Sequence, residues 1–98
     1  MVNLYRRGRI AERKVVNYLK TKGFRNIRRS KGSRGPADIY ARKGNVKYYI
    51  QVKYGTASAT RQEIRKLRAL ARKRGGAAVI IKRSKEGKIR WKFLGKWK

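Results

Sequence analysis

Four residues could do chemistry together: two acids that lack an obvious local role, an amide and a lysine. The chain has only 4 Asp and Glu residues against 31 Lys and Arg, so each carboxylate stands out. Residues two apart on a strand point to the same face, so Gln51 and Lys53 should emerge side by side. Asp38 begins the adjoining predicted strand, and Glu12 lies on the first predicted helix. We therefore expect carboxylates, an amide oxygen and an ammonium to converge at one end of a sheet.

Such a group suits the hydrolysis of phosphodiester bonds. A hard divalent cation prefers oxygen ligands of this kind. The cation would activate water and neutralise charge on the phosphorus, while a nearby ammonium would orient the water or stabilise that charge. The chain has no histidine and no cysteine, and this chemistry needs neither.

Each of these residues also has an ordinary structural explanation. Glu12 could pair with one of its basic neighbours, and Asp38 could accept a turn-end hydrogen bond from the backbone. Gln51 and Lys53 could belong to the polar outer face of a strand. Taken one at a time, these explanations compete well with a catalytic role.

The remaining two acids are explained locally. Glu63 fits the third helical position of a capping box that begins at Thr60, where it also favours the helix dipole. Glu86 precedes Gly87 in a solvated turn. Neither is expected to take part in catalysis.

Composition points to a nucleic-acid partner. The net charge of +27 over 98 residues produces self-repulsion that a polyanion would relieve. A ribosomal-type RNA binder or a chromatin-like DNA coater would share this charge, so composition alone does not single out a nuclease.

Other classes of protein are excluded by the same composition. Without cysteine there can be no disulfide framework and no thiolate zinc site. No apolar run approaches the roughly 20 residues that span a bilayer, and no signal peptide is visible. We expect a soluble cytoplasmic protein, associated with the nucleoid, without a membrane partner.

Periodicity predicts the element order α-β-β-β-α-β-β. Apolar spacing of three and four residues marks the helices, and β-branched or aromatic residues mark the strands. Glycines end both helices, and a stretch rich in glycine and serine from Ser30 to Pro36 forms a turn or mobile loop. The predicted elements are a helix over Arg6–Lys22, strands over Phe24–Arg29, Asp38–Arg42 and Val46–Lys53, a helix from Thr60 to Gly75, a strand over Ala77–Lys82 and a strand through Ile89, Trp91 and Phe93.

The chemistry-bearing residues match a known motif. Glu12, Pro36-Ala37-Asp38 and Gln51-Val52-Lys53 resemble the PD-(D/E)XK nuclease signature in order and spacing. Within that superfamily the chain is most similar to the archaeal Holliday-junction resolvases, over roughly residues 5 to 94. The further shared segments are Tyr5-Arg6-Arg7-Gly8, Ala11-Glu12-Arg13, Lys22-Gly23-Phe24, Arg28-Arg29-Ser30 to Gly32-Ser33, Gly75-Gly76 and Trp91-Lys92-Phe93.

The resemblance implies a fold and an active site. The fold would be a single α/β domain over residues 1–98, restriction-endonuclease-like, with a central mixed β-sheet flanked by two helices. Glu12 and Asp38 would bind Mg²⁺ or Mn²⁺, with Gln51 and the carbonyl of Val52 as further ligands. Lys53 would be the catalytic lysine. A serine near the scissile phosphate would be Ser30 or Ser33.

The resemblance also implies how DNA is held. Family members are homodimers that cut four-way junctions or related branched DNA. The face formed by Ile89, Trp91 and Phe93 is our candidate for the dimer interface, with a simple core role as the alternative. The residues expected to contact DNA are Arg6, Arg7, Arg9, Arg13, Arg28, Arg29, Lys31 and Arg34.

One position departs from the family pattern. Position 51 is Gln where the family has an acid, so a charged ligand is replaced by a neutral amide oxygen and metal affinity should fall. A junction-binding protein with weak or lost catalysis, or another PD-(D/E)XK endonuclease, is therefore an alternative.

Overall fold

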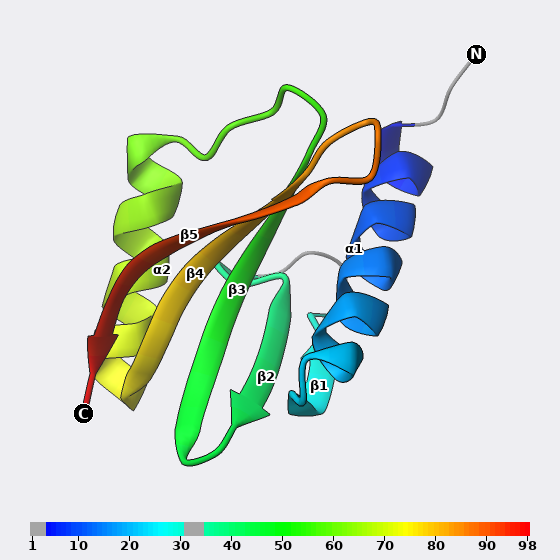
Figure 1. The fold of residues 1–98 in the computed structure, drawn as a ribbon. Helices are drawn as coiled ribbons and strands as arrows, with labels where there is room; N and C mark the ends of the chain where they lie inside the picture. The colour runs from blue at the N-terminus through cyan, green and yellow to red at the C-terminus, as the bar shows by residue number, and fades with distance from the viewer. Residues whose placement is uncertain (1–3, 31–34) are drawn as a thin grey trace.

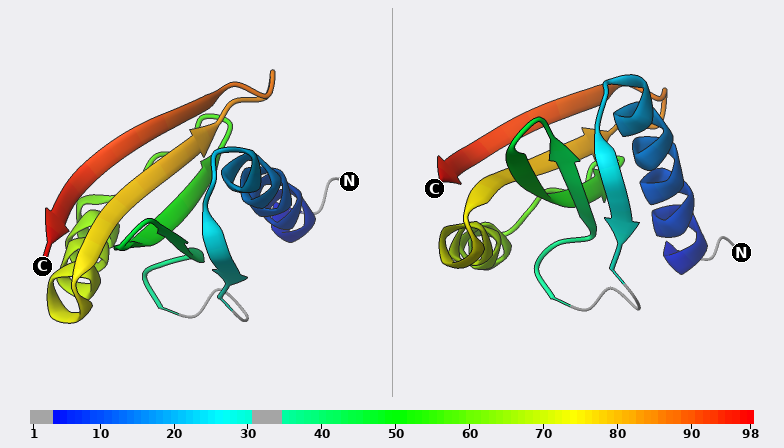
Figure 2. Two further views of the ribbon diagram at one scale, coloured as in Figure 1. Left: turned by 60° about the horizontal axis from the view of Figure 1, so that its bottom comes forward. Right: turned by 90° about the horizontal axis from the view of Figure 1, so that it is seen from below.

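A computed structural model describes residues 4–30 and 35–98, which form a five-stranded mixed sheet with one helix on each face (Figures 1 and 2). The elements are α1 (Leu4–Thr21), β1 (Arg25–Arg29), β2 (Ile39–Lys43), β3 (Val46–Tyr54), α2 (Arg61–Arg74), β4 (Gly76–Arg83) and β5 (Ile89–Trp97). This small α/β arrangement and its element order confirm the fold predicted from the sequence.

The strands lie in the order β1-β2-β3-β4-β5, and among these described strands only β3 and β4 run parallel. Antiparallel neighbours can be joined by a short turn, whereas parallel neighbours need a crossover. Helix α2 is that crossover between β3 and β4. Because the crossover leaves from the carboxyl end of β3, the first turn of α2 follows closely on the end of the strand that carries Lys53.

Two apolar cores lie on opposite faces of the sheet. Helix α1 covers one face and α2 covers the other, as both views in Figure 2 show. The core under α1 contains Val15, Leu19, Phe24, Ile39, Ala41, Ile50, Val79 and Ile81. The core under α2 contains Ala37, Tyr49, Leu67, Ala71, Ala78, Ile80 and Leu94.

The local signals in the sequence act as predicted. Thr60 is the N-cap of α2, and both hydrogen bonds of its capping box with Glu63 are present. Gly75 ends α2 with φ 76°, a conformation that glycine adopts without steric cost. Gly44 makes the β2–β3 turn with φ 60° for the same reason.

Strand β5 only partly follows the predicted alternation. Ile89 packs against the core under α1 and Trp91 stacks on Phe24, whereas Phe93 is 62% exposed. Leu94 points to the face opposite Phe93 and belongs to the core under α2, and a bulge opposite Ala78 and Val79 then shifts the register so that Trp97 packs against the same core. The proposed dimer face is thus divided: Ile89 has a core role, and Phe93 remains available to a partner.

Candidate active site

Asp38 closes the open end of the β2–β3 ladder. The last residue pair of that ladder joins Ile39 to Ile50. Beyond it, the N–H of Asp38 donates to the carbonyl of Ile50 at 2.8 Å, and the N–H of Val52 donates to Oδ2 of Asp38 at 2.8 Å. The N–H of Ser30 donates to the carbonyl of Asp38 at 2.9 Å. The carboxylate is therefore fixed against the backbone of β3, close to the end that carries Lys53.

The surroundings of Asp38 raise the free energy of its ionised form. Burial raises the pKa of Asp38 from its ordinary value of 3.8. The Val52 N–H and the Lys53 ammonium act in the opposite direction, and the Glu63 carboxylate raises the pKa further. A group held in this way would favour a bound cation, which restores the charge stabilisation that burial removes.

Gln51 faces the same side of the sheet as Lys53, as the sequence predicts. The side chain is only 7% exposed, and its Nε2 donates to Oε2 of Glu63 at 2.5 Å. Its Oε1 is buried and has no hydrogen-bond partner among the described residues. Buried acceptors are usually satisfied, so this oxygen is an open position for a ligand that accepts electron pairs.

Glu63 belongs to this group, which sequence reasoning missed. Its Oε1 accepts the Thr60 N–H at 3.0 Å, as a capping box requires. Its Oε2 contacts Gln51 and also lies 2.8 Å from Nζ of Lys53. The lysine is the main reason that the pKa of Glu63 falls from 4.5 to about 2, followed by the Thr60 N–H. The predicted capping role is confirmed but incomplete.

A signal for Glu63 did exist in the sequence. A crossover helix that follows β3 starts at the carboxyl end of that strand, and its first-turn side chains can reach residues there. Glu63 comes ten positions after Lys53 in a chain with few acids. The position of that first turn relative to β3 required the tertiary structure.

The other predicted catalytic residues are placed with less detail. Glu12 is half-buried on α1, and its role as a metal ligand stays a prediction. Ser30 lies beside Asp38 through the backbone hydrogen bond described above. Ser33 lies outside the described residues. The structure thus brings together Asp38, Val52 and Ser30 from the predicted set, along with Gln51 and Lys53.

The predicted DNA contacts within the described residues lie on β1 and α1. The side chains of Arg13, Arg28 and Arg29 are exposed to solvent, as phosphate contacts require. Lys31 and Arg34 lie outside the described residues, as do the side chains of three arginines on α1, namely Arg6, Arg7 and Arg9.

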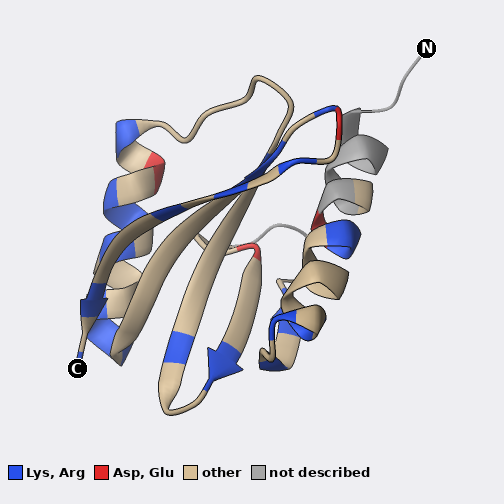
Figure 3. Cartoon of the chain, in the orientation of Figure 1, with Lys and Arg blue, Asp and Glu red and all other residues tan. Residues whose placement is uncertain are grey.

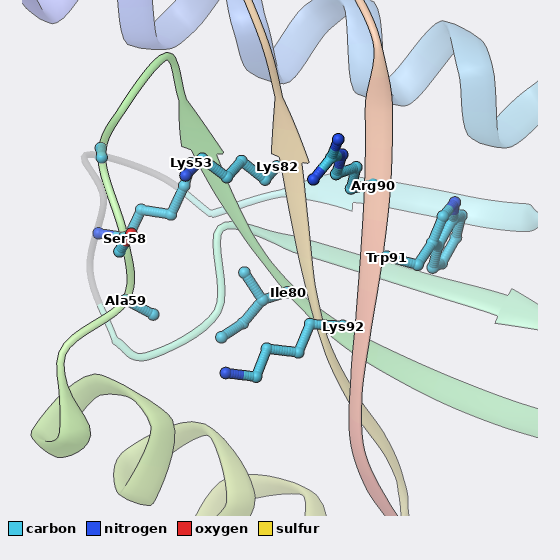
Figure 4. A pocket seen from close by; sticks show the side chains of 9 residues that line it. Lys53, Ser58, Ala59, Ile80, Lys82, Arg90, Trp91 and Lys92 are labelled. Atoms are coloured by element: carbon cyan, nitrogen blue, oxygen red, sulfur yellow. The ribbon is translucent and has the colours of Figure 1, made fainter.

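A basic hollow beside Lys53 was not predicted. It has a volume of about 360 Å³ and is bordered by β3, β4, β5 and the loop before α2. Figure 4 shows Lys53, Lys82, Arg90 and Lys92 around it. Other basic residues are spread over both helices and several strands of the described chain (Figure 3). The hollow offers a phosphate backbone a positively charged path that ends at the candidate active site.

The described residues fit a metal site made of mixed oxygen donors. They contain no group of three or more His, Cys, Asp or Glu side chains that could hold a metal ion by themselves. Carboxylate, amide and backbone oxygens all suit Mg²⁺ or Mn²⁺. The buried Oε1 of Gln51 is such a donor.

In the part of the chain that the structure describes, no helix is long and apolar enough to cross a membrane.

Comparisons with known proteins identify the family of the chain. Residues 3–97 match the family model of the archaeal Holliday junction resolvases (Hjc). Among solved structures, the fold is similar to that of Archaeoglobus fulgidus Hjc, described as a Holliday junction resolvase from an archaeal hyperthermophile. That similarity has a TM-score of 0.77 and 25% sequence identity, and covers 90% of this chain and 73% of the other. A search among curated proteins gave no match.

Proposed function

The chain belongs to the archaeal Holliday junction resolvase family, and we propose that it cuts branched DNA with Mg²⁺ or Mn²⁺ bound at the end of β3. Its nuclease and resolvase function follows from family membership and from the likeness to A. fulgidus Hjc. The metal, the preference for four-way junctions over other branched DNA and the homodimer are the proposed parts.

One observation carries the metal proposal: Asp38 and the amide of Gln51 lie at the same end of β3 as Lys53. The Val52 N–H holds the Asp38 carboxylate in place. Glu12 would complete the ligand set from α1, and the carbonyl of Val52 is a further expected ligand. When bound, the ion would supply positive charge at the phosphate and lower the pKa of a water molecule.

The protein's own residues would bind and position the DNA. The Lys53 ammonium would stabilise negative charge that develops on the scissile phosphate. Lys82, Arg90 and Lys92 around the hollow would hold the phosphate backbone on the approach to Lys53. Contacts of this kind position DNA without reading its sequence, which suits a protein that recognises branched shape.

A homodimer would present two such sites to the two strands that a resolvase must cut. The exposed ring of Phe93 on the edge strand β5 supports a partner there, because an aromatic side chain 62% exposed is stabilised by burial against a second subunit. The net charge of +27 supports association of the protein with the nucleoid.

A cleavage assay tests the proposal. Purified protein is incubated with a four-way junction, a nicked duplex and a linear duplex, each with and without Mg²⁺ or Mn²⁺. We expect cutting of the junction only when the metal is present. A protein that binds the junction tightly yet never cuts it with either metal would instead be a non-catalytic junction binder, the alternative that Gln51 raises.

A further inference from the structure

The contacts of Glu63 exceed what its capping role requires. Capping uses Oε1, which accepts the N–H of Thr60. Oε2 makes two more contacts, with Nε2 of Gln51 at 2.5 Å and with Nζ of Lys53 at 2.8 Å. An ionised carboxylate has about four acceptor positions, so these three contacts leave room for a further one.

We propose that Glu63 supplies the carboxylate that β3 lacks at position 51, and that it binds the catalytic metal together with Asp38. The proposal rests on the metal-dependent function proposed above and extends it to a residue outside the recognised motif. In this proposal the second negatively charged metal ligand, after Asp38, comes from α2 and not from β3.

The state of Gln51 supports this assignment independently. The same amide that donates to Glu63 carries Oε1, which is buried and unpartnered among the described residues. Nε2 donates to the carboxylate of Glu63, so Oε1 is not used in that contact and stays available as a neutral ligand. A cation at this point would have a carboxylate and an amide oxygen from one hydrogen-bonded pair.

Electrostatic repulsion explains why position 51 carries an amide when position 63 carries a carboxylate. Two ionised carboxylates at positions 51 and 63 would repel each other at the observed separation, whereas an amide donates a hydrogen bond. The Gln51–Glu63 pair thus carries one negative charge, which is the charge that an acid at position 51 would supply. Asp38 accepts the N–H of Val52, the residue between Gln51 and Lys53, so both carboxylates contact the same three-residue segment of β3.

An exchange of the two side chains tests the proposal. Glu63→Gln removes the charge but retains a residue that serves at the third position of a capping box. The exchange variant, Gln51→Glu with Glu63→Gln, returns the charge to the strand and can keep the hydrogen bond with its direction reversed. Mn²⁺ binding by the DNA-free protein is measured from the loss of free-ion electron paramagnetic resonance signal, alongside metal-dependent cutting of a junction.

Two matched controls separate metal binding from helix stability and from net charge. Thr60→Ala removes the hydroxyl that accepts the N–H of Glu63 and leaves the contacts of the Glu63 side chain in place. Glu86→Gln removes one negative charge from the turn between β4 and β5. Thermal unfolding of each variant shows whether the protein is folded.

We expect Glu63→Gln to weaken Mn²⁺ binding by roughly tenfold or more, and the exchange variant to recover a large part of that loss. Both controls should bind Mn²⁺ as the parent does. Parental binding by folded Glu63→Gln, or an exchange variant no better than Glu63→Gln, would overturn the assignment of Glu63. A parent protein that binds no Mn²⁺ and cuts nothing would instead overturn the metal dependence itself.

Discussion

Nζ of Lys53 lies 2.8 Å from Oε2 of Glu63, so an ammonium on β3 and a carboxylate in the first turn of α2 form an ion pair. Their side chains are 21% and 33% exposed, which leaves the pair accessible from solvent. The contact joins a residue of the nuclease motif to a residue outside it.

The pair should make stability depend on pH in the acid range. The Lys53 hydrogen bond, with help from the Thr60 N–H, lowers the pKa of Glu63 from 4.5 to about 2. Because the pKa is lowered in the folded protein, the ionised carboxylate of Glu63 stabilises the fold at pH values above its ordinary pKa of 4.5. This stabilisation is lost as pH falls from about 4.5 to about 2. The free energy of unfolding in urea should therefore drop more steeply over this window in the parent than in Glu63→Gln. Parallel curves would contradict the ion pair.

The ionised carboxylate of Asp38 should destabilise the fold, in contrast to that of Glu63. Burial raises the pKa of its carboxyl, so the ionised form opposes folding at neutral pH. Asp38→Asn keeps the shape and an oxygen that can accept the Val52 N–H, and we expect it to unfold at higher urea concentration than the parent at pH 7. This gain in stability should shrink as pH falls below the pKa of Asp38, because the Asp38 side chain of the parent is then uncharged, like that of the variant. A less stable variant at pH 7 would show that the charge of Asp38 is well compensated.

The basic hollow should contribute to DNA affinity in a salt-dependent way. Lys92→Gln removes one charge from the hollow, so junction binding should weaken and the slope of log affinity against log salt should fall by about one unit. Lys47→Gln is the matched control, because Lys47 is exposed at the other end of β3, about 20 Å from Lys53 along the strand. Equal effects of the two substitutions in fluorescence anisotropy would mean that the hollow has no special role.

The exposed edge of β5 should control the oligomeric state. Phe93→Arg places a charge where an aromatic ring is 62% exposed, so the monomer should stay folded while a dimer that uses this face dissociates. Sedimentation velocity at several protein concentrations measures the mass. A variant that remains as dimeric as the parent would exclude this face as the interface.

Local patterns were sufficient to predict the elements of the fold. Apolar spacing indicated both helices, and the Thr60 and Glu63 pair located the start of α2 because a capping box acts within one turn. The bulge in β5 could not be predicted in the same way, since it depends on how Gly95 and Phe93 pair with β4. Its consequence, the packing of Trp97 against the core under α2, was not predicted.

The candidate site was predicted only where one strand or one motif determines it. Gln51 and Lys53 share a face because alternate residues on a strand must do so. Contacts between elements were not predictable: the hydrogen bond from Gln51 to Glu63 depends on where α2 packs. Likewise, Lys82 and Arg90 meet Lys53 around the hollow only because β4 and β5 extend the sheet beyond β3.

The central claim is that the end of β3 is a metal-dependent catalytic centre, and Asp38→Asn tests it most directly. Single-turnover cleavage of a four-way junction in Mg²⁺ is compared between variant and parent, with junction affinity measured without divalent metal. We predict that the cleavage rate falls by about 100-fold or more while affinity is unchanged, because the lost charge acts on the reaction and not on DNA binding. An Asp38→Asn protein that cuts as fast as the parent would contradict the claim.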